Sequence, residues 1–439
     1  MIMRIIYFLL CTFGLFTASA QDGYISYFTG DTTDFMTDDY LPGLLLAGGA
    51  TDNDDGMQWF LERAGGGDIL VMRASGSDGY NDYLYEELGV NVNSVETILF
   101  QNINASSDPY VLQQIANAEA IFFAGGDQYN YYLLWKDTPV EDALNAAINE
   151  KGITVGGTSA GMAILGDCYY TPSGDSADAD EALFDPFHPD LDIIGKGDFL
   201  QVPFTENLIT DTHYDQRDRA GRHFTFMARI AAEYGVRSYG IAANEYTAVA
   251  VDGAGIARAF GEYADYPEDV VYFLRSNCQD DFQPETIQPG IPLTWQRGGA
   301  AVKAYQMPAT AEAEFTFDLN DWETATGGTW QNWTAENGTF AQIETDISDC
   351  ADGLPSAVAG TFSPTITAFP NPATDFIALQ FAENIPLHVP VTVSGAGGKE
   401  VRIVVRERSN RAVTLDTTDL PPGVYFVKTG KQAGRFVKR

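Results

Sequence analysis

Basic residues are scarce in this sequence. Its 439 residues include 25 Lys and Arg against 61 Asp and Glu, which gives a formal net charge of −36. Nucleic acids and anionic lipid surfaces bind basic protein surface, so this composition argues against both as partners. The acidic excess is typical of a well-solvated protein.

Long apolar runs are missing as well. No segment approaches about 18 uninterrupted apolar residues, the length needed to span a bilayer. The N-terminal apolar run, residues 5–16, follows Arg4 and precedes the small residues Ala18-Ser19-Ala20. This order is typical of a cleaved secretory signal peptide. We therefore expect residues 1–20 to be removed on export and the mature chain to have no transmembrane segment.

Cysteine is also rare. Of the four cysteines, Cys11 lies in the expected signal peptide, which leaves Cys168, Cys278 and Cys350. No Cys-x-x-Cys pair is present, so the sequence predicts no metal site. Export permits a disulfide, although spacing alone does not fix the pairing. We favour Cys278 with Cys350, because Cys168 lies close in sequence to the candidate nucleophile described below.

The composition changes along the chain and indicates several domains. About 420 mature residues are enough for two or three domains. Residues 391–439 are net basic whereas the remainder is strongly acidic, and such a change of sign marks a separate module. We predict a first domain over residues 21–305, a β-rich extension and linker over 306–362, and a C-terminal domain over 363–439. Short strands separated by turns predict that the last of these is a small β-sandwich.

Short apolar runs that end in glycine alternate with helix-like stretches in the first domain. The runs are residues 44–47, 69–72, 95–100, 121–124 and 153–155. The helix-like stretches include residues 57–63, 110–118 and 140–150. This alternation predicts βαβ units, and continuous apolar strands predict a parallel sheet covered on both faces. We therefore expect an α/β fold with a doubly wound parallel sheet and a site at the carboxyl ends of its strands.

A candidate nucleophile follows the last of these runs, in Gly157-Thr158-Ser159-Ala160-Gly161. Gly-x-Ser-x-Gly after a strand is typical of a nucleophile elbow, a strained strand-to-helix turn in which the flanking residues must be small. The helix that is expected to follow would direct free N–H groups toward developing negative charge. Ser159 is therefore the predicted nucleophile.

The small number of histidines narrows the search for a base. Only His188, His213, His223 and His388 are present. A serine nucleophile needs a base of near-neutral pKa, which histidine supplies. His388 lies in the C-terminal domain, and His188, in Pro186-Phe187-His188-Pro189, is typical of a turn. His213 is therefore the predicted base, with a structural histidine as the alternative.

Three motifs together resemble a known family. Gly125-Gly126-Asp127-Gln128, the serine motif, and Asp211-Thr212-His213-Tyr214 followed by Arg217, Arg219 and Arg222 are similar, in this order, to the cyanophycinase and aspartyl-dipeptidase serine peptidases. The resemblance covers roughly residues 41–272. It implies a class I glutamine-amidotransferase-like, flavodoxin-like fold and an exopeptidase activity that requires no cofactor. One departure is Thr212, where cyanophycinases usually carry glutamine, so cyanophycin itself is in doubt as the substrate.

The same resemblance assigns roles around the serine. Backbone N–H groups of Gly126 and Ala160 would form the oxyanion hole. The residues that would organise the substrate pocket or meet substrate carboxylates are Asp127, Gln128, Asp211, Arg217, Arg219 and Arg222. The alternative for the arginines is a solvated helix face, because spacings of two and three do not form one stripe. We favour Arg217 as the functional arginine of the three.

A third triad member should hold the imidazole and stabilise its charged form. The stretch between the serine and the histidine is longer than is usual in the family, which makes this acid hard to align. We choose Glu181, in Asp180-Glu181-Ala182-Leu183. Asp178, Asp185 and Glu245 are the alternatives.

The C-terminal domain carries a second resemblance. Phe369-Pro370-Asn371-Pro372, then Asp419 to Val427, and the ending Arg435-Phe436-Val437-Lys438-Arg439 resemble the type IX secretion sorting domain. This implies interaction with that secretion machinery and passage through the periplasm to the outside or the outer cell surface. An ordinary carbohydrate- or partner-binding β domain is the alternative.

We therefore predict a secreted serine exopeptidase that acts on aspartyl peptides, with the choice between α and β linkage left open. One alternative is an α/β-hydrolase esterase, which shares the elbow and the order of the triad. No His-Gly-Gly-Gly segment precedes Ser159, and His213 follows closely, so this alternative fits poorly. A second is a catalytically inactive surface protein that binds peptide or glycan. The sequence gives no indication of oligomeric state.

Overall fold

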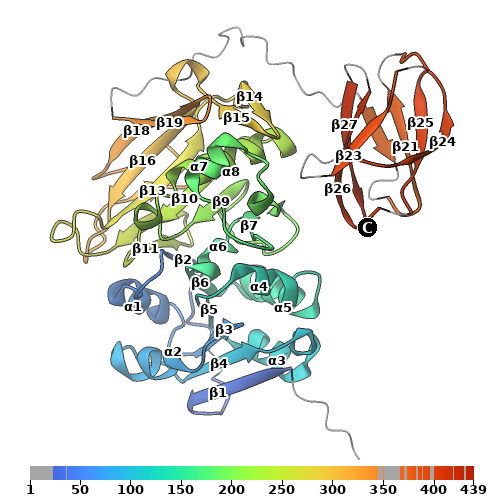
Figure 1. The fold of residues 1–439 in the computed structure, drawn as a ribbon. Helices are drawn as coiled ribbons and strands as arrows, with labels where there is room; N and C mark the ends of the chain where they lie inside the picture. Colours follow the sequence, from blue (N-terminus) through green and yellow to red (C-terminus); the bar gives the residue numbers. More distant parts are fainter. Residues whose placement is uncertain are drawn as a thin grey trace, which may run out of the picture.

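The computed structural model describes residues 23–35, 37–344, 350, 366–369, 373–381, 384–387, 389–395, 400–418, 420–429 and 432–439. The expected signal peptide, most of the expected linker, and His388 lie outside these residues. Two sheets and their helices form the first part of the chain, and two smaller sheets form the C-terminal part (Figure 1).

The first sheet has the order β1-β4-β3-β5-β6-β2-β11-β12-β17. Its five central strands, from β4 to β2, run parallel. The bounds are β1 Tyr24–Gly30, β2 Gly43–Ala47, β3 Asp68–Arg73, β4 Ser94–Phe100, β5 Ala120–Phe123, β6 Thr154–Thr158, β11 Ala248–Asp252, β12 Ile256–Phe260 and β17 Phe317–Asp318. The five apolar runs of the sequence are these parallel strands, so the α/β prediction is confirmed.

Helices cover both faces of this sheet. They are α1 Asp54–Glu62, α2 Gly79–Asp82, α3 Pro109–Asn117, α4 Gln128–Trp135, α5 Pro139–Ala146 and α6 Ala160–Ala163. Short helical turns connect them: η1 Tyr83–Glu87, η2 Ile103–Ser107 and η3 Ala147–Lys151. Local chemistry sets their starts, since Asn53 and Asp108 cap α1 and α3 by accepting backbone N–H bonds, and Pro109 occupies the first turn of α3.

A second sheet, which the sequence pattern does not predict, has the order β19-β18-β16-β13-β10-β9-β7-β8. Its bounds are β7 Cys168–Tyr170, β8 Ile194–Lys196, β9 Leu208–Asp211, β10 Tyr239–Ala243, β13 Val270–Ser276, β16 Val302–Pro308, β18 Thr329–Glu336 and β19 Thr339–Ile343. Helices α7 Ala179–Phe184 and α8 Ala220–Tyr234 lie with it, as do the turns η4 Pro189–Leu191, η5 Asp215–Arg217 and η6 Arg297–Gly299 and the hairpin of β14 Thr286–Gln288 and β15 Ile291–Thr294. Strands β9 and β10 are parallel neighbours, which places the segments that follow them side by side.

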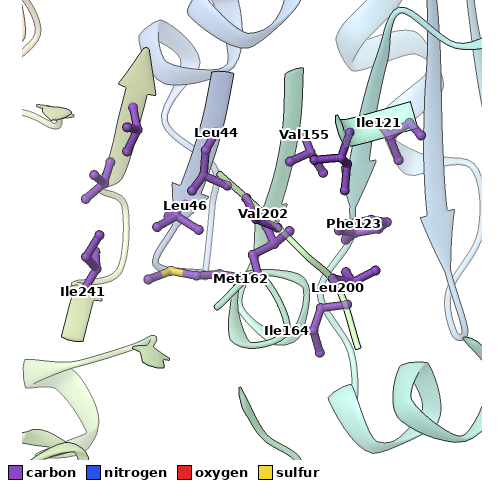
Figure 2. Packing of buried hydrophobic residues seen from close by; sticks show 14 of the residues in the cluster. Leu44, Leu46, Ile121, Phe123, Val155, Met162, Ile164, Leu200, Val202 and Ile241 are labelled. Atoms are coloured by element: carbon purple, nitrogen blue, oxygen red, sulfur yellow. The ribbon is translucent and has the colours of Figure 1, made fainter. Parts of the chain in front are cut away.

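The two sheets share one apolar core, drawn in Figure 2. Side chains alternate across a strand, so Leu44 and Leu46 of β2 face this core while Leu45 packs with α1 on the other side of the first sheet. Ile241 of β10 and Val271 of β13 reach the same core from the second sheet. The opposite face of the second sheet packs against α7 and α8. The result is a layered arrangement in which the two sheets are joined by burial of apolar surface.

The β-rich segment after Ala300 extends both sheets of the first part. Strands β16, β18 and β19 continue the second sheet, and β17 pairs with β12 at the edge of the first. The expected disulfide between Cys278 and Cys350 is confirmed, and Cys168 is a buried free thiol. The bridge ties the residue at the end of this segment to the loop that follows β13.

The C-terminal part consists of two four-stranded sheets, β20-β21-β25-β24 and β23-β22-β26-β27. The strands are β20 Ile366–Phe369, β21 Phe376–Phe381, β22 Thr392–Gly395, β23 Glu400–Val401, β24 Val404–Arg408, β25 Ala412–Asp416, β26 Gly423–Thr429 and β27 Gln432–Lys438. Leu379 and Leu415 of one sheet and Val427 and Phe436 of the other lie in one buried cluster, as in a small sandwich. Among the described residues, no helix has the length and apolar character to cross a membrane.

Candidate active site

A polar cavity of about 220 Å³ opens between the two sheets at the carboxyl end of β6. Its walls include Gly126 after β5, Ser159 after β6 and His213 after β9. In parallel α/β sheets this edge is the usual position of a ligand site, as the sequence predicts here. A larger cavity of about 430 Å³ lies beside the amino ends of β3 and β4, away from the motifs, and includes Asp68 and Ser94.

Ser159 occupies a strained turn between β6 and α6. Its φ of 52° and ψ of −114° lie outside the regions that a serine ordinarily adopts. The two flanking glycines are required by space. A Cβ on Gly157 would lie 2.5 Å from the carbonyl carbon of Gly161, and a Cβ on Gly161 would lie 2.0 Å from the oxygen of Phe123. The predicted nucleophile elbow is therefore present.

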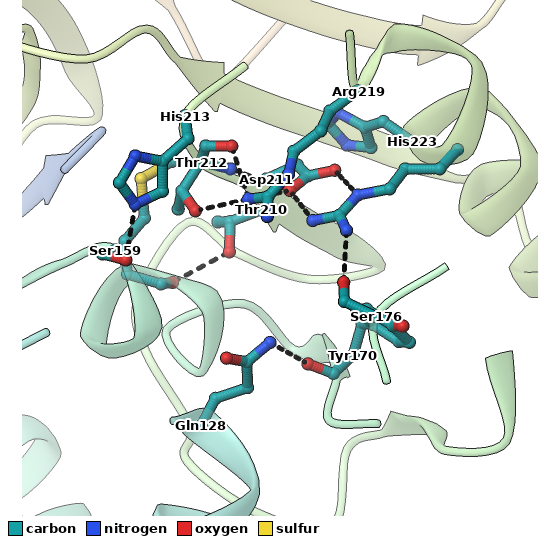
Figure 3. Close-up of polar contacts among 12 residues, drawn as sticks. Gln128, Ser159, Tyr170, Ser176, Thr210, Asp211, Thr212, His213, Arg219 and His223 are labelled. Carbon is teal, nitrogen blue, oxygen red and sulfur yellow. Dashed lines mark hydrogen bonds and ion pairs between the residues drawn. The ribbon is translucent and has the colours of Figure 1, made fainter. Parts of the chain in front are cut away.

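Ser159, His213 and Glu245 form one hydrogen-bonded line. The Oγ of Ser159 lies 2.8 Å from Nε2 of His213. The Nδ1 of His213 lies 2.6 Å from Oε1 of Glu245, which follows β10. Figure 3 shows Ser159 and His213 joined in this way, with Gln128 and Tyr170 below them in the view. An acceptor at Nδ1 fixes the tautomer that leaves Nε2 free to take the serine proton.

Consecutive backbone carbonyls at the end of β2 hold all three segments. The oxygen of Ala47 accepts from the N–H of Ser159, and the oxygen of Gly48 accepts from the N–H of His213. The oxygen of Gly49 accepts from the N–H of Tyr246, beside Glu245. Glycine is needed for this approach, because a Cβ on Gly48 would lie 1.9 Å from the Asn244 oxygen and one on Gly49 2.4 Å from the imidazole.

Glu181, the acid chosen from the sequence, does not contact His213. It is the third residue of α7, where its carboxylate accepts from the N–H of Asp178 and its own N–H donates to the Asp178 side chain. These two bonds form a capping box, which explains an acid at this position without any catalytic role. Asp185 likewise accepts from the N–H of Phe187. Among the alternatives, only Glu245 meets the imidazole, so the choice of Glu181 is corrected to Glu245.

Burial sets the protonation state of His213. Its side chain is 9% exposed, and desolvation lowers its pKa below the ordinary histidine value. The hydrogen bond to Glu245 acts in the opposite direction, while the positive charges of Arg217 and Arg219 lower the pKa further. The imidazole is therefore neutral at neutral pH, as a general base must be.

Asp211, two residues before His213, forms a buried ion pair with Arg222. The Nε and Nη2 of Arg222 lie 2.8 and 2.6 Å from the two carboxylate oxygens of Asp211, and its Nη1 donates to Ser176. Arg222 holds the pKa of the Asp211 carboxyl below its usual value against the effect of desolvation. Arg219 donates to the oxygen of Thr212, and burial lowers its pKa to about 10. These two arginines are committed to the protein itself and fix the segment that carries His213.

Arg217 differs from the other two arginines. It lies exposed at the end of η5 and lines the cavity, and its side chain has no hydrogen bond or ion pair within the described part of the chain. Gln128, the first residue of α4, also lines the cavity, and its Nε2 lies 3.5 Å from the backbone oxygen of Tyr170. Asp127 caps α4 by accepting from the N–H of Tyr129, so its carboxylate is already used. Arg217 and Gln128 are therefore the expected pocket residues that remain available to a ligand.

Two backbone N–H groups border the nucleophile. Ala160 follows Ser159 as the first residue of α6, and Gly126 follows β5 with a φ of 155°. Neither N–H has a hydrogen-bond acceptor within the described residues. Such free donors beside a nucleophile suit an oxyanion, which matches the roles expected of both residues.

The remaining described histidines have structural surroundings. His223 lies fully buried in α8 near the oxygen of Ile209, and burial lowers its pKa to about 4. His188 accepts from the N–H of Asp190 in a turn, as expected. Glu181, His188 and Asp190 form the one group of possible metal ligands found among the described residues. This group is exposed at its glutamate and lies outside the cavity lining.

Asn244 is a residue of the site that was not predicted from the sequence. It lies directly between the end of β10 and Glu245, and its side chain is fully buried. A usable signal was present, because Ile241 to Ala243 form an apolar run that is followed at once by two polar residues. The parallel pairing of β9 with β10 then brings Asn244 and Glu245 to His213.

Comparisons with known proteins find similarity in two segments of the chain. Residues 77–258 match the model of peptidase family S51, and residues 367–439 match that of the secretion system C-terminal sorting domain. The cyanophycinase of Synechococcus elongatus is 27% identical over 242 residues, which cover 52% of this chain and 70% of the relative. The cyanophycinase of Geminocystis herdmanii (strain PCC 6308) is 26% identical over 204 residues, 44% of this chain and 70% of the relative. The crystal structure of a peptidase from an acI-B1 Actinobacterium aligns with a TM-score of 0.39 and 15% identity over 62% of this chain and 96% of that one.

The site and these matches define a serine-type peptidase, a hydrolase. Residues 77–258 are similar to peptidase family S51, and residues 367–439 match the secretion system C-terminal sorting domain. That domain directs export to the cell surface or the outside.

The lack of space for a Cβ between Gly49 and the imidazole gives a direct test. Gly49→Ala should slow the reaction of Ser159 with a neutral phosphonate ester probe by about 10²-fold, because the added methyl displaces the base. The labelling rate, followed by intact-protein mass spectrometry, measures this. Gly89→Ala is the matched control, since its φ is also positive but a Cβ there meets nothing within 4 Å. Equal rates in both variants would contradict the account.

The direction of the His213 pKa shift predicts the pH dependence. The base acts when neutral, so a lowered pKa places the acid limb of the labelling rate below the ordinary histidine value of about 6.5. Arg217→Gln removes a charge that lowers this pKa and should move the limb to higher pH. Glu245→Gln removes a bond that raises it and should move the limb to lower pH. A limb that moves the same way in both variants would refute this assignment.

Proposed function

We propose that this protein is a secreted serine exopeptidase that cleaves aspartyl peptides through a Ser159–His213–Glu245 triad. The observation that carries the proposal is the unbroken line of hydrogen bonds from the strained serine through the buried imidazole to the carboxylate. Each group has the environment that its role requires. The nucleophile faces the cavity, the base is neutral, and the acid is still partly exposed at 21%.

The mechanism follows from these positions. The Nε2 of His213 takes the proton from Ser159 as its Oγ attacks the substrate carbonyl. The negative charge that develops on the carbonyl oxygen meets the N–H groups of Gly126 and Ala160, and Glu245 stabilises the imidazolium. When the tetrahedral intermediate collapses, the imidazolium gives its proton to the leaving amine and an acyl-serine remains. Water, activated by the same histidine, then attacks the ester and releases the acid and free Ser159.

Substrate acidity is inferred from the cation in the cavity. Arg217 presents a guanidinium with no protein partner among the described residues, and guanidinium pairs well with carboxylate. The relatives named cyanophycinase are consistent with an aspartyl substrate, either α- or β-linked. A cavity of about 220 Å³ fits a small peptide unit better than a long chain. We also infer, from the order of its parallel strands β4-β3-β5-β6-β2, that the first sheet is a variant of the class I glutamine-amidotransferase-like fold.

Two other functions receive less support. An inactive peptide- or glycan-binding protein has no need for a strained serine that is hydrogen-bonded to a neutral imidazole. An α/β-hydrolase esterase is disfavoured, because the acid of the present site follows the histidine in the chain, whereas in that fold it precedes it.

A peptide panel tests the proposal. It should contain α- and β-aspartyl dipeptides, aspartyl-arginine polymer and neutral dipeptides, with cleavage followed by mass spectrometry. Wild type should cleave aspartyl substrates, and Ser159→Ala should lose about 10⁴-fold or more of the rate. Full activity of Ser159→Ala would overturn the nucleophile.

Arg217→Gln isolates the proposed recognition of acid. It should raise KM for aspartyl peptides at least about tenfold, the effect of losing one charged hydrogen-bond pair. Neutral peptides should be affected little. Arg63→Gln is the matched control, because its guanidinium donates to Pro42 and lies outside the cavity. An unchanged preference in Arg217→Gln would remove the arginine from substrate recognition.

A further inference from the structure

Beside the triad, hydrogen bonds between two further residue pairs join the segment that carries His213 to the segment that carries Glu245. The N–H of Asp215 donates to Oδ1 of Asn244 at 3.1 Å, and the Nδ2 of Asn244 donates to Oδ2 of Asp215 at 2.8 Å. The N–H of Glu245 also donates to the Oε1 of Gln216 at 3.1 Å. Asp215 lies two residues after His213, and Asn244 lies directly before Glu245. These bonds therefore act on the two segments whose spacing sets the His213–Glu245 distance.

The amide of Asn244 can point only one way. Its Oδ1 faces a donor, while its Nδ2 faces Asp215 Oδ2 and, at 2.7 Å, the oxygen of Glu268. A flipped amide would face acceptors with its oxygen and a donor with its nitrogen, and three bonds would be lost. Since the side chain is fully buried, water could not replace them. The arrangement is therefore held in one geometry.

Asp215 is held in turn by a chain of polar side chains that runs across the second sheet. The hydroxyl of Tyr272 in β13 donates to Asp215 Oδ2 at 2.9 Å and accepts from Nε2 of Gln306 in β16 at 3.0 Å. Gln331 in β18 donates to Gln306 at 3.1 Å, and the indole N–H of Trp333 donates to Gln331 at 2.8 Å. Burial and the nearby Asp215 carboxylate raise the pKa of Tyr272, so its hydroxyl stays protonated as a donor.

The series of hydrogen-bonded side chains from Trp333 to Tyr272 lies outside the segment that matches the peptidase family. The match ends at residue 258, whereas β13, β16 and β18 span 270–336. Tyr272 lies directly opposite Gln306 on the adjacent strand, and Gln331 lies opposite Ala304, two residues before Gln306 in β16. The strands beyond the matched segment thus reach the active-site segment through side chains as well as through the sheet.

We infer that Asp215 and Asn244 are positioning residues for the triad, and that the chain of Tyr272, Gln306, Gln331 and Trp333 braces them from the strands beyond the family-matched segment. The inference rests on the proposed function of Ser159, His213 and Glu245. Asp215 touches no reacting atom and acts through the spacing of His213 and Glu245. A displacement of about 1 Å in such a spacing costs about 10²-fold in rate.

Two pairs of variants test this role. Asp215→Ala removes the acceptor, whereas Asp215→Asn keeps one amide oxygen for both Asn244 and Tyr272. Tyr272→Phe removes the hydroxyl at the centre of the chain. Tyr169→Phe is its matched control, because that hydroxyl donates to Asp198 at 2.8 Å elsewhere. In the full chain, the rate of labelling by the neutral phosphonate probe, the kcat and KM for a cleaved peptide, and the melting temperature would be measured.

We expect Asp215→Ala to slow labelling and kcat by about 10- to 100-fold and Tyr272→Phe by about 3- to 10-fold. Asp215→Asn and Tyr169→Phe should stay within about threefold of wild type. In Tyr272→Phe the KM should change little, because Arg217 and Gln128 are untouched. These losses of rate should be seen at temperatures well below the melting transition. A variant that had lost only stability would still be folded at those temperatures and would keep the wild-type rate.

The outcomes separate this inference from the proposed function. Normal labelling and turnover in Asp215→Ala and Tyr272→Phe, with Ser159 labelled in wild type, would overturn the positioning role alone. Equal losses in Asp215→Ala and Asp215→Asn would also overturn it, because the retained acceptor should rescue. Wild type that is folded yet not labelled at Ser159 would remove the proposed function and this role with it.

Discussion

The end of β2 is the constraint on which the site depends. Three successive carbonyls, from Ala47 to Gly49, accept the N–H groups of Ser159, His213 and Tyr246. The serine comes from the first sheet and the other two segments from the second, so this short stretch sets the distance between nucleophile, base and acid. It can do so because Gly48 and Gly49 leave no Cβ between the backbones. Apolar burial between the sheets then keeps the two halves from separating.

The three arginines that line the cavity have different roles, because two of them bind the protein itself and one is available to a substrate. Arg222 pairs with Asp211 and Arg219 donates to the backbone of Thr212, so both hold the segment that directly precedes His213. Both keep the base in a buried position, where desolvation holds it neutral. Arg217 alone of the three reaches the cavity without a partner among the described residues, and it lowers the pKa of the base as well. An acidic substrate that paired with it would weaken that effect and make the base stronger.

Patterns within single segments explain what the sequence could predict. The five parallel strands, the elbow at Ser159 and the sandwich-like C-terminal part follow from apolar periodicity and from glycine placed by steric need. The second sheet does not follow from such patterns, because it depends on which separate segments pair, such as β9 with β7 and β13 with β16. The choice of Glu181 failed for a related reason, since a capping box and a triad both favour an acid and only the pairing of β9 with β10 brings Glu245 to His213.

The proton between His213 and Glu245 gives the most direct test of the triad. The imidazole Nδ1–H should appear in the proton NMR spectrum as a resonance far downfield of the amide region, since it is buried and bonded to a carboxylate at 2.6 Å. The account predicts that this resonance is present in wild type and in Glu181→Gln and is lost in Glu245→Gln. A resonance that survives in Glu245→Gln, or disappears in Glu181→Gln, would contradict the assignment of Glu245 and the arrangement built on it.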